Sequence, residues 1–293
     1  FLPFLPKDYC QISIDREHEA YLQYYFPEIK RGPFLPLAGT SLWEEDTLPK
    51  WEERPYDVVF TGNYTPLSKF EPTIERHGKE YADFYYGIIE DFKKHPHLGM
   101  DIGIREHLLS EVEDITEDGV KEMMPNMIMI DLYVRNYFRG KVVQTLVDAG
   151  VSVHCFGAGW EFLPCEHPEN LIKEGGVDSL ACLQALSKAK VSLNVMPWFK
   201  DGAHDRVFNS MLNGAVCFTD WSRYLTENLR DGEDIFFYEL DALECLPDMV
   251  QGILENRKKW EHMQKAAYET AEKSHTWEHR AGAVHKEILS KIR

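Results

Sequence analysis

The chain has 293 residues, of which 44% are hydrophobic and 13% aromatic, a composition typical of a folded globular protein with a large core. Asp and Glu outnumber Lys and Arg by 49 to 32, so the formal net charge is −17. Such an acidic chain argues against nonspecific binding to nucleic acid or to an anionic membrane, because both need a basic surface.

The cysteines and the hydropathy indicate the compartment. No apolar run approaches the roughly 18 residues of a membrane-spanning helix, so we expect no membrane span. The cysteines are Cys10, Cys155, Cys165, Cys182, Cys217 and Cys245. They form no CxxC pair, which favours free thiols and a cytoplasmic protein. The first residues, FLPFLP, show neither an initiator Met nor a signal peptide, and we expect a piece of a longer protein.

The first part of the chain cannot close a core of its own. The pattern predicts a strand over 9–14, a helix over 17–25 and a loop or edge strand over 32–39. The polar segment 43–54 follows and predicts a linker.

Strands and helices alternate through the rest of the chain. Strands are predicted over 56–61 (YDVVFT), 151–156, 190–196 (KVSLNVM), 215–219 (AVCFT) and 234–238. Helical patterns cover 81–94, 127–146, 179–187 and most of 243–293. This alternation predicts an α/β fold with a doubly wound parallel sheet.

A polar loop joins the strand 190–196 to the next helix. Apolar residues recur at helical spacing over 207–212, so His204 and Arg206 lie near the helix N-terminus. Free N–H groups and the helix dipole favour an anion there, and an arginine adds a bidentate phosphate donor. In parallel sheets ligands bind at the carboxyl ends of the strands, so we expect a phosphate-bearing ligand at this loop.

Other sites lack support. The sequence Gly157-Ala158-Gly159 begins like a dinucleotide fingerprint, but Phe162 replaces its third glycine. The chain contains no P-loop, no GxSxG and no HExxH. His275 and His279 are one helical turn apart, yet no third ligand is evident, and we predict no metal site.

Several stretches of the chain form a family pattern. The most specific is His204-x-Arg206-x-Phe208, followed by the sequence NGA at 213–215 and a strand that ends in TD at 219–220. The segment 130–135 leading to Arg139, the sequence FGAGW at 156–160 and the tail at 275–280 belong to the same pattern. Together these stretches resemble the glycosyltransferase group 1 family, in particular its spore-maturation-protein-like branch. The resemblance covers about residues 56–290.

The resemblance implies a GT-B-type fold, in which two Rossmann-like domains face each other across a cleft. Residues 1–50 would then be the C-terminal remnant of the N-terminal, acceptor-side domain. Residues 51–275 would be the domain that binds the nucleotide-sugar donor, and 276–293 a C-terminal helix that crosses back.

Site residues follow from the same resemblance. The implied catalytic residues are His204, Arg206 and Asp201. The implied donor-binding residues are Gly62, Asn63, Lys69, Gly157, Gly159, Phe208 and Asn209. Many relatives carry two glutamates eight residues apart, where this chain has Asp201 and Asn209. The general base for the acceptor hydroxyl would be Asp15 or His18.

The resulting expectation is a metal-independent glycosyltransferase without a cofactor. It would move a hexose-like sugar from a nucleotide diphosphate to a glycan, protein or lipid-linked acceptor. Two alternatives remain open at this point. One is a non-catalytic module of the same fold that binds a nucleotide sugar or a partner. The other is a different nucleotide-binding α/β enzyme, such as an epimerase.

Overall fold

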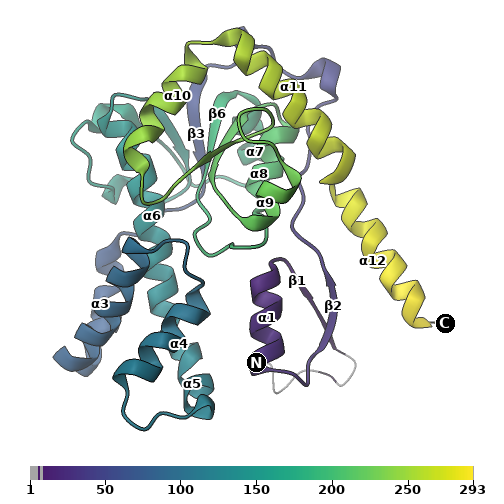
Figure 1. Ribbon diagram of the computed structural model, residues 1–293. Helices are drawn as coiled ribbons and strands as arrows, with labels where there is room; N and C mark the ends of the chain where they lie inside the picture. The colour runs from purple at the N-terminus through teal and green to yellow at the C-terminus, as the bar shows by residue number, and fades with distance from the viewer. Residues whose placement is uncertain (1–5, 7–8, 293) are drawn as a thin grey trace.

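The computed structural model describes residues 6 and 9–292 and centres on a six-stranded sheet (Figure 1). The strands are β3 (Tyr56–Thr61), β4 (Val153–Phe156), β5 (Leu171–Gly175), β6 (Ala189–Asn194), β7 (Val216–Asp220) and β8 (Phe236–Tyr238). They are all parallel, in the order β5-β4-β3-β6-β7-β8. The order reverses between β3 and β6, and a crevice forms at the carboxyl ends of the strands at such a switch point.

The two central strands are apolar on both faces. Val58 of β3 pairs with Val191 of β6, and Phe60 pairs with Leu193. All four side chains are fully buried. Unbroken apolar runs of this kind are typical of parallel strands that are covered on both sides.

Helices cover both faces of the sheet. On one face lie α6 (Ile128–Asp148) and α10 (Leu246–Leu254), and on the other lie α7 (Ser179–Ser187), α8 (Asp205–Leu212) and α11 (Arg257–Ser274). Val58 and Phe60 of β3 point into the core beneath α6, whereas Val59 packs against α7. The predicted α/β class with a doubly wound parallel sheet is therefore confirmed. A short helix, α9 (Arg223–Asn228), follows β7.

A helical part precedes α6 and lies below the sheet in Figure 1. It consists of α2 (Glu71–Ile74), α3 (Lys79–Lys94), α4 (Met100–Glu111) and α5 (Glu117–Met123). Tyr85, Ile89 and Leu108 from these helices share one buried core with Ile130 and Val134 of α6. Because the far half of α6 packs on the sheet, α6 joins the helical part to the sheet.

The N-terminal segment forms a small βαβ unit beside the helical part (Figure 1). Its strands β1 (Cys10–Ser13) and β2 (Lys30–Phe34) are parallel, and α1 (Arg16–Tyr25) connects them. The last helix, α12 (Trp277–Ile292), runs back against β2. None of the described helices has the length and apolar character that a membrane crossing requires.

Three details differ from the sequence-based expectations. β5 was not predicted, because its second half is an exposed edge that carries Lys173 and Glu174 rather than an apolar run. The long helical pattern from 243 is divided into α10, α11 and α12 at Asn256 and His275. The segment 43–54 is not a free linker, because Arg54 is only 1% exposed.

The guanidinium of Arg54 explains how that segment is held. It donates hydrogen bonds to the carbonyl oxygens of Ala189 at 2.7 Å and Asn213 at 3.2 Å, and its Nε donates to Pro49. It also lies over the ring of Trp260, 5.1 Å from the centroid. One buried side chain thus ties a polar segment to the sheet and to α11.

Candidate functional site

A cleft of about 510 Å³ opens at the carboxyl ends of the central strands. The strand ends and the loops after them contribute Thr61, Gly62, Asn63, Phe156, Gly157, His204, Asp205, Arg206 and Asn209. One further wall consists of Ser179, Cys182 and Leu183 of α7. The cleft therefore lies at the switch point of the sheet, where the fold alone predicts a ligand.

Two arginines make the cleft cationic. Arg206 is 8% exposed, and its Nη1 donates to the carbonyl oxygen of Thr61 at 2.9 Å. Arg139 of α6 is half-buried and donates to the carbonyl oxygen of Asn63 at 2.5 Å, while its Nε is buried without a hydrogen-bond partner. Among the described residues, neither arginine forms an ion pair with a carboxylate, and Asp205 acts on the charge of Arg206 from beyond ion-pair distance. Two neighbouring cations without an ion-paired carboxylate favour an anionic ligand.

The pKa values of the two arginines reflect their burial and their proximity to each other. Burial, followed by the neighbouring positive charge of Arg206, lowers the pKa of Arg139 to about 9. Burial also lowers the pKa of Arg206. An anion between the two guanidinium groups would reverse part of this effect, because an opposite charge stabilises the protonated form.

His204 adds a neutral hydrogen-bonding group. It is the N-cap of α8, and its Nδ1 lies 2.6 Å from a carboxylate oxygen of Asp205 and 3.2 Å from the backbone nitrogen of Arg206. Burial and the adjacent Arg206 lower the pKa of His204 to about 4. At neutral pH the imidazole is therefore uncharged, and the cationic character of the cleft comes from its arginines and from the N-terminus of α8.

Glycines let the loops of the cleft approach one another. A Cβ at Gly157 would lie 2.2 Å from the carbonyl oxygen of Gly62, and one at Gly62 would lie 2.9 Å from Nη1 of Arg206. The side chain of Asn63 then fixes this arrangement, because its Oδ1 accepts from the backbone N–H of Ala158 at 2.8 Å. The space left by Gly157 is thus occupied by protein backbone.

Asn209 lines the cleft with its amide already bonded. Its Oδ1 accepts from the backbone N–H of Thr40 at 2.8 Å, and its Nδ2 donates to Asp205 at 3.2 Å. It therefore connects α8 to the segment after β2.

Asp201 lies elsewhere. It is 3% exposed, and its carboxylate pairs with Arg16 at 2.8 Å and with Arg223 at 3.1 Å. Its backbone N–H donates to the carboxylate of Asp15 at 3.0 Å. Asp201 does not line the cleft, and its contacts join α1 to the sheet.

The remaining predicted residues divide between core and surface. Phe208 is fully buried and stacks on His275, with ring centroids 4.3 Å apart. Lys69 is exposed and does not line the cleft. Gly159 faces Tyr64 rather than the cleft. The structure therefore brings together Gly62, Asn63, Gly157, His204, Arg206 and Asn209, and their roles remain predictions.

The comparisons with known proteins decide the family. A family model described as glycosyl transferase-like matches residues 139–286, half of the chain. The chain belongs to this glycosyl transferase-like family. No curated protein matches it.

Solved glycosyltransferase structures share the GT-B-type α/β fold with this family member. Alr3699/HepE from Anabaena in complex with UDP and glucose is 10% identical, with a TM-score of 0.51 over 95% of this chain and 62% of that one. TarM is also 10% identical, with a TM-score of 0.50 over 95% of this chain and 42% of that one. The chain thus spans less than two thirds of the length of either structure.

Sequence reasoning gave no site role to several residues of this glycosyl transferase-like protein. Arg139 belongs to the family pattern, but the sequence did not indicate that it is a second, half-buried cation in the cleft. Its spacing of four residues from Arg135 places both on one face of α6, and that was the available signal. Thr40 and Trp277 come from distant segments, and no local pattern relates them to the cleft.

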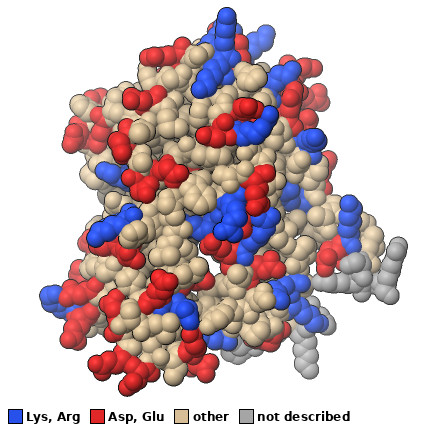
Figure 2. Space-filling view, in the orientation of Figure 1, with Lys and Arg blue, Asp and Glu red and all other residues tan. Residues whose placement is uncertain are grey.

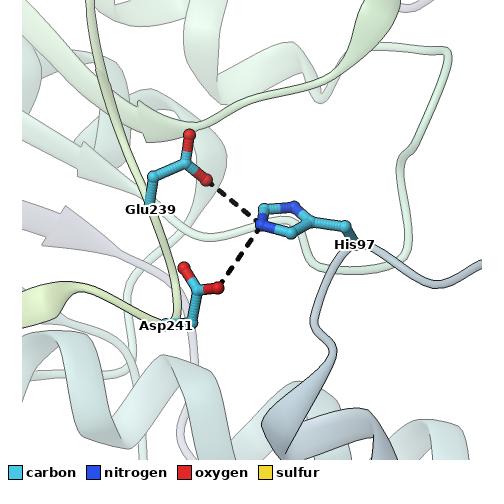
Figure 3. Close-up of side chains that lie close together, drawn as sticks. All are labelled: His97, Glu239 and Asp241. Atoms are coloured by element: carbon cyan, nitrogen blue, oxygen red, sulfur yellow. Dashed lines mark ion pairs between the residues drawn. The ribbon is translucent and has the colours of Figure 1, made fainter.

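One group of potential metal ligands occurs outside the cleft (Figure 3). Nε2 of His97 lies 3.3 Å from Glu239 and 3.8 Å from Asp241. The His97 ring stacks on Trp221, whose indole N–H donates to Glu239 at 3.0 Å. All three potential ligands are exposed and already paired with one another. The group links the loop after α3 to the loop after β8.

Proposed function

We propose that the protein is a glycosyltransferase whose donor is a nucleotide-diphosphate sugar bound in the switch-point cleft. The single observation that carries the proposal is the pair of neighbouring guanidinium groups in the cleft, Arg206 buried and Arg139 half-buried, neither of them ion-paired with a carboxylate among the described residues. A diphosphate supplies two negative charges to such a pair through strong charge-assisted hydrogen bonds. The Alr3699/HepE structure contains UDP and glucose, and this makes UDP the first nucleotide to test.

The same residues support a mechanism that does not require a metal ion. As the bond between the sugar and the diphosphate breaks, negative charge grows on the leaving group. Arg139, Arg206 and the N-terminus of α8 would stabilise that charge from fixed positions. His204, held neutral by its surroundings with its N–H directed at Asp205, would accept a hydrogen bond from a hydroxyl of the sugar at Nε2. We expect transfer to persist in the presence of EDTA.

The finer assignments belong to the same proposal. They are a hexose as the transferred sugar, membership of the spore-maturation-protein-like branch, and a glycan, protein or lipid-linked acceptor. They also include an acceptor-side role for residues 1–50, a donor-binding role for 51–275 and a location in the cytoplasm. Cys155, Cys165, Cys182, Cys217 and Cys245 are free thiols, which supports a reducing compartment.

Calorimetry with UDP and UDP-glucose tests the donor site. We expect wild-type protein to bind both, and Arg139→Gln and Arg206→Lys each to bind UDP at least about tenfold more weakly, as expected for loss of a bidentate contact. Arg257→Gln is the matched control, because Arg257 is exposed, pairs with the exposed Glu52 and Glu261, and lies outside the cleft. Circular dichroism would verify that each variant folds. Failure of wild-type protein to bind any UDP-, GDP- or TDP-linked sugar would overturn the proposal.

One observation favours a second candidate, a binding module without transfer. The family resemblance implies two glutamates where this chain has Asp201, which is held in ion pairs outside the cleft, and Asn209, which is uncharged. Incubation with radiolabelled UDP-glucose separates the two functions. Release or transfer of labelled glucose would exclude the binding module, whereas tight UDP binding without any turnover would support it.

A further inference from the structure

A second cleft, of about 470 Å³, lies between α1 and the helical part. The space-filling view is hollowed between these two parts (Figure 2). Much of its lining is apolar, including Met100, Ile104, Met124, Met127, Ile128 and Trp198. We refer to it as the methionine cleft. Flexible, polarisable methionines adapt to apolar ligands of varied shape.

The methionine cleft adjoins the switch-point cleft. Arg135 lines the first and Arg139 the second, and they are one turn apart on α6, about 6 Å along the helix axis. The ring of Phe199 lies between the two sites. Its centroid is 5.9 Å from that of His18 in the methionine cleft and 5.9 Å from that of His204 in the other.

Three carboxylates line the methionine cleft, beside His18, Tyr21 and a single arginine, Arg135. They are Glu17 of α1, Asp101 of α4 and Asp131 of α6. Asp131 pairs with Arg135 at 2.5 Å. Burial raises the pKa of each of the three carboxyl groups, and the neighbouring Asp15 and Asp101 raise that of Glu17 further. A bound anion would add to this repulsion, so the cleft discriminates against anionic ligands.

We propose that the methionine cleft is the acceptor site and that it takes a small, uncharged or cationic amphipathic molecule with an alkyl or aromatic body and a free hydroxyl. The proposal rests on the glycosyltransferase function proposed above. The volume suits a small molecule rather than a folded polypeptide. The apolar wall accounts for the alkyl or aromatic body, and the carboxylates accept hydrogen bonds from hydroxyl groups near the sugar donor.

The sugar transfer uses groups that line the two clefts. The acceptor hydroxyl oxygen forms a bond to the anomeric carbon of the donor sugar. The bond between that carbon and the diphosphate oxygen breaks, and its electron pair leaves with the diphosphate toward Arg139 and Arg206. The hydroxyl proton passes to the imidazole of His18, which lines the methionine cleft.

Two matched probes test the chemistry of the site. We expect octyl β-D-glucoside, below its micelle concentration, to bind at least tenfold more tightly than octyl β-D-glucuronide in calorimetry. We also expect it to gain one hexose in the presence of UDP-glucose, detected by mass spectrometry. Equal affinity for the two probes would contradict the role of the carboxylates.

Two variants locate the binding. Ile128 is 50% exposed at the start of α6 and lines the cleft, whereas Ile102 is 47% exposed on α4 and does not. Because both are exposed, replacement by Glu is compatible with folding. Ile128→Glu should weaken octyl glucoside binding at least tenfold and leave UDP binding within twofold, and Ile102→Glu should change neither.

The outcomes separate this inference from the proposed function. If UDP binds but octyl glucoside does not, or if Ile128→Glu binds the glucoside like wild type, the acceptor site is wrong and the donor proposal stands. If wild-type protein binds no nucleotide sugar, the proposed function fails and the acceptor role fails with it.

Discussion

At the scale of single residues, contacts between the loops beside the cleft determine which side chains these loops tolerate. Gly159 has a left-handed backbone with φ of 91°, and a Cβ there would lie 1.9 Å from the carbonyl oxygen of Tyr64. The ring of Tyr64 stacks on Trp160, with centroids 5.4 Å apart. The loop after β4 is therefore fixed against the loop after β3 before any ligand binds.

We expect Gly159→Ala to lower the free energy of unfolding by at least about 2 kcal/mol, because backbone strain and a steric clash act together. Urea denaturation measures this change. Gly175→Ala is the matched control, since Gly175 has a similar φ of 78° but nothing within 4 Å of an added Cβ. Gly175→Ala should lower the free energy of unfolding only by the backbone strain, about 1 kcal/mol. Equal losses in the two variants would show that the clash with Tyr64 is relieved.

At the scale of secondary-structure elements, His275 joins α11 to α12. It is 3% exposed, stacks on Phe208 of α8, and its Nδ1 lies 3.2 Å from Nη2 of Arg280. Burial, with a contribution from Arg280, lowers the pKa of His275 to about 4. The imidazole thus holds this junction together in its neutral, hydrogen-bond-accepting form.

This shift predicts a loss of stability in acid. The pKa of His275 is lower in the folded chain than its unfolded value near 6.5, so the unfolded chain binds more protons between these values. The stabilisation that the neutral imidazole of His275 gives to the fold is complete above pH 6.5 and is lost as the pH falls toward 4. Between pH 7.5 and 4, wild type should lose about 3 kcal/mol more than His275→Gln. His279→Gln, an exposed neighbour, should behave like wild type in urea denaturation.

The sequence predicts elements best where the apolar pattern is strong. The central strands are unbroken apolar runs and the amphipathic helices have a helical period, and the polar loop before α8 indicates an anion site at the correct edge of the sheet. The sequence did not predict β5, because one face of this edge strand is solvated and the strand therefore has no continuous apolar run. The sequence did not predict that Arg54 is buried. An arginine whose hydrogen bonds go only to backbone carbonyl oxygens has no local sequence pattern that distinguishes it from an exposed arginine.

The residue pattern alone predicted the site only where one loop supplies it. His204 and Arg206 follow from the strand-loop-helix pattern, whereas the family resemblance implied the other predicted residues that line the cleft, namely Gly62, Asn63, Gly157 and Asn209. Arg139 lies on a different helix and meets Arg206 only through the tertiary fold. Asp201 is close to the loop in sequence but turns toward α1, because Arg16 and Arg223 supply its counter-ions.

At the scale of the whole molecule, polar contacts hold the N-terminal βαβ unit to the rest of the chain. Arg280 of α12 donates to the carbonyl oxygens of Pro36 at 2.7 Å and Leu37 at 3.2 Å. On the other side Arg16 of α1 reaches Asp201. Figure 2 shows acidic side chains over much of the visible face and a group of basic side chains near its centre. These contacts position α1, which forms one wall of the methionine cleft.

The position of Asp201 therefore predicts a structural role rather than a direct one in transfer. Asp201→Asn removes the charge that the partly exposed Arg16 and Arg223 share, and loss of charge-assisted hydrogen bonds at a buried acceptor costs about 2 kcal/mol. We expect urea denaturation to show a loss of this order and calorimetry to show UDP affinity within twofold of wild type. Glu227→Gln is the matched control, because Glu227 also pairs with Arg16 but is 49% exposed, and this substitution should lower the free energy of unfolding by less than about 1 kcal/mol.

Unchanged stability of Asp201→Asn together with complete loss of transfer would instead place Asp201 in the chemistry. Because α1 also carries His18, a loosened α1 should reduce transfer to octyl glucoside more than it reduces UDP binding.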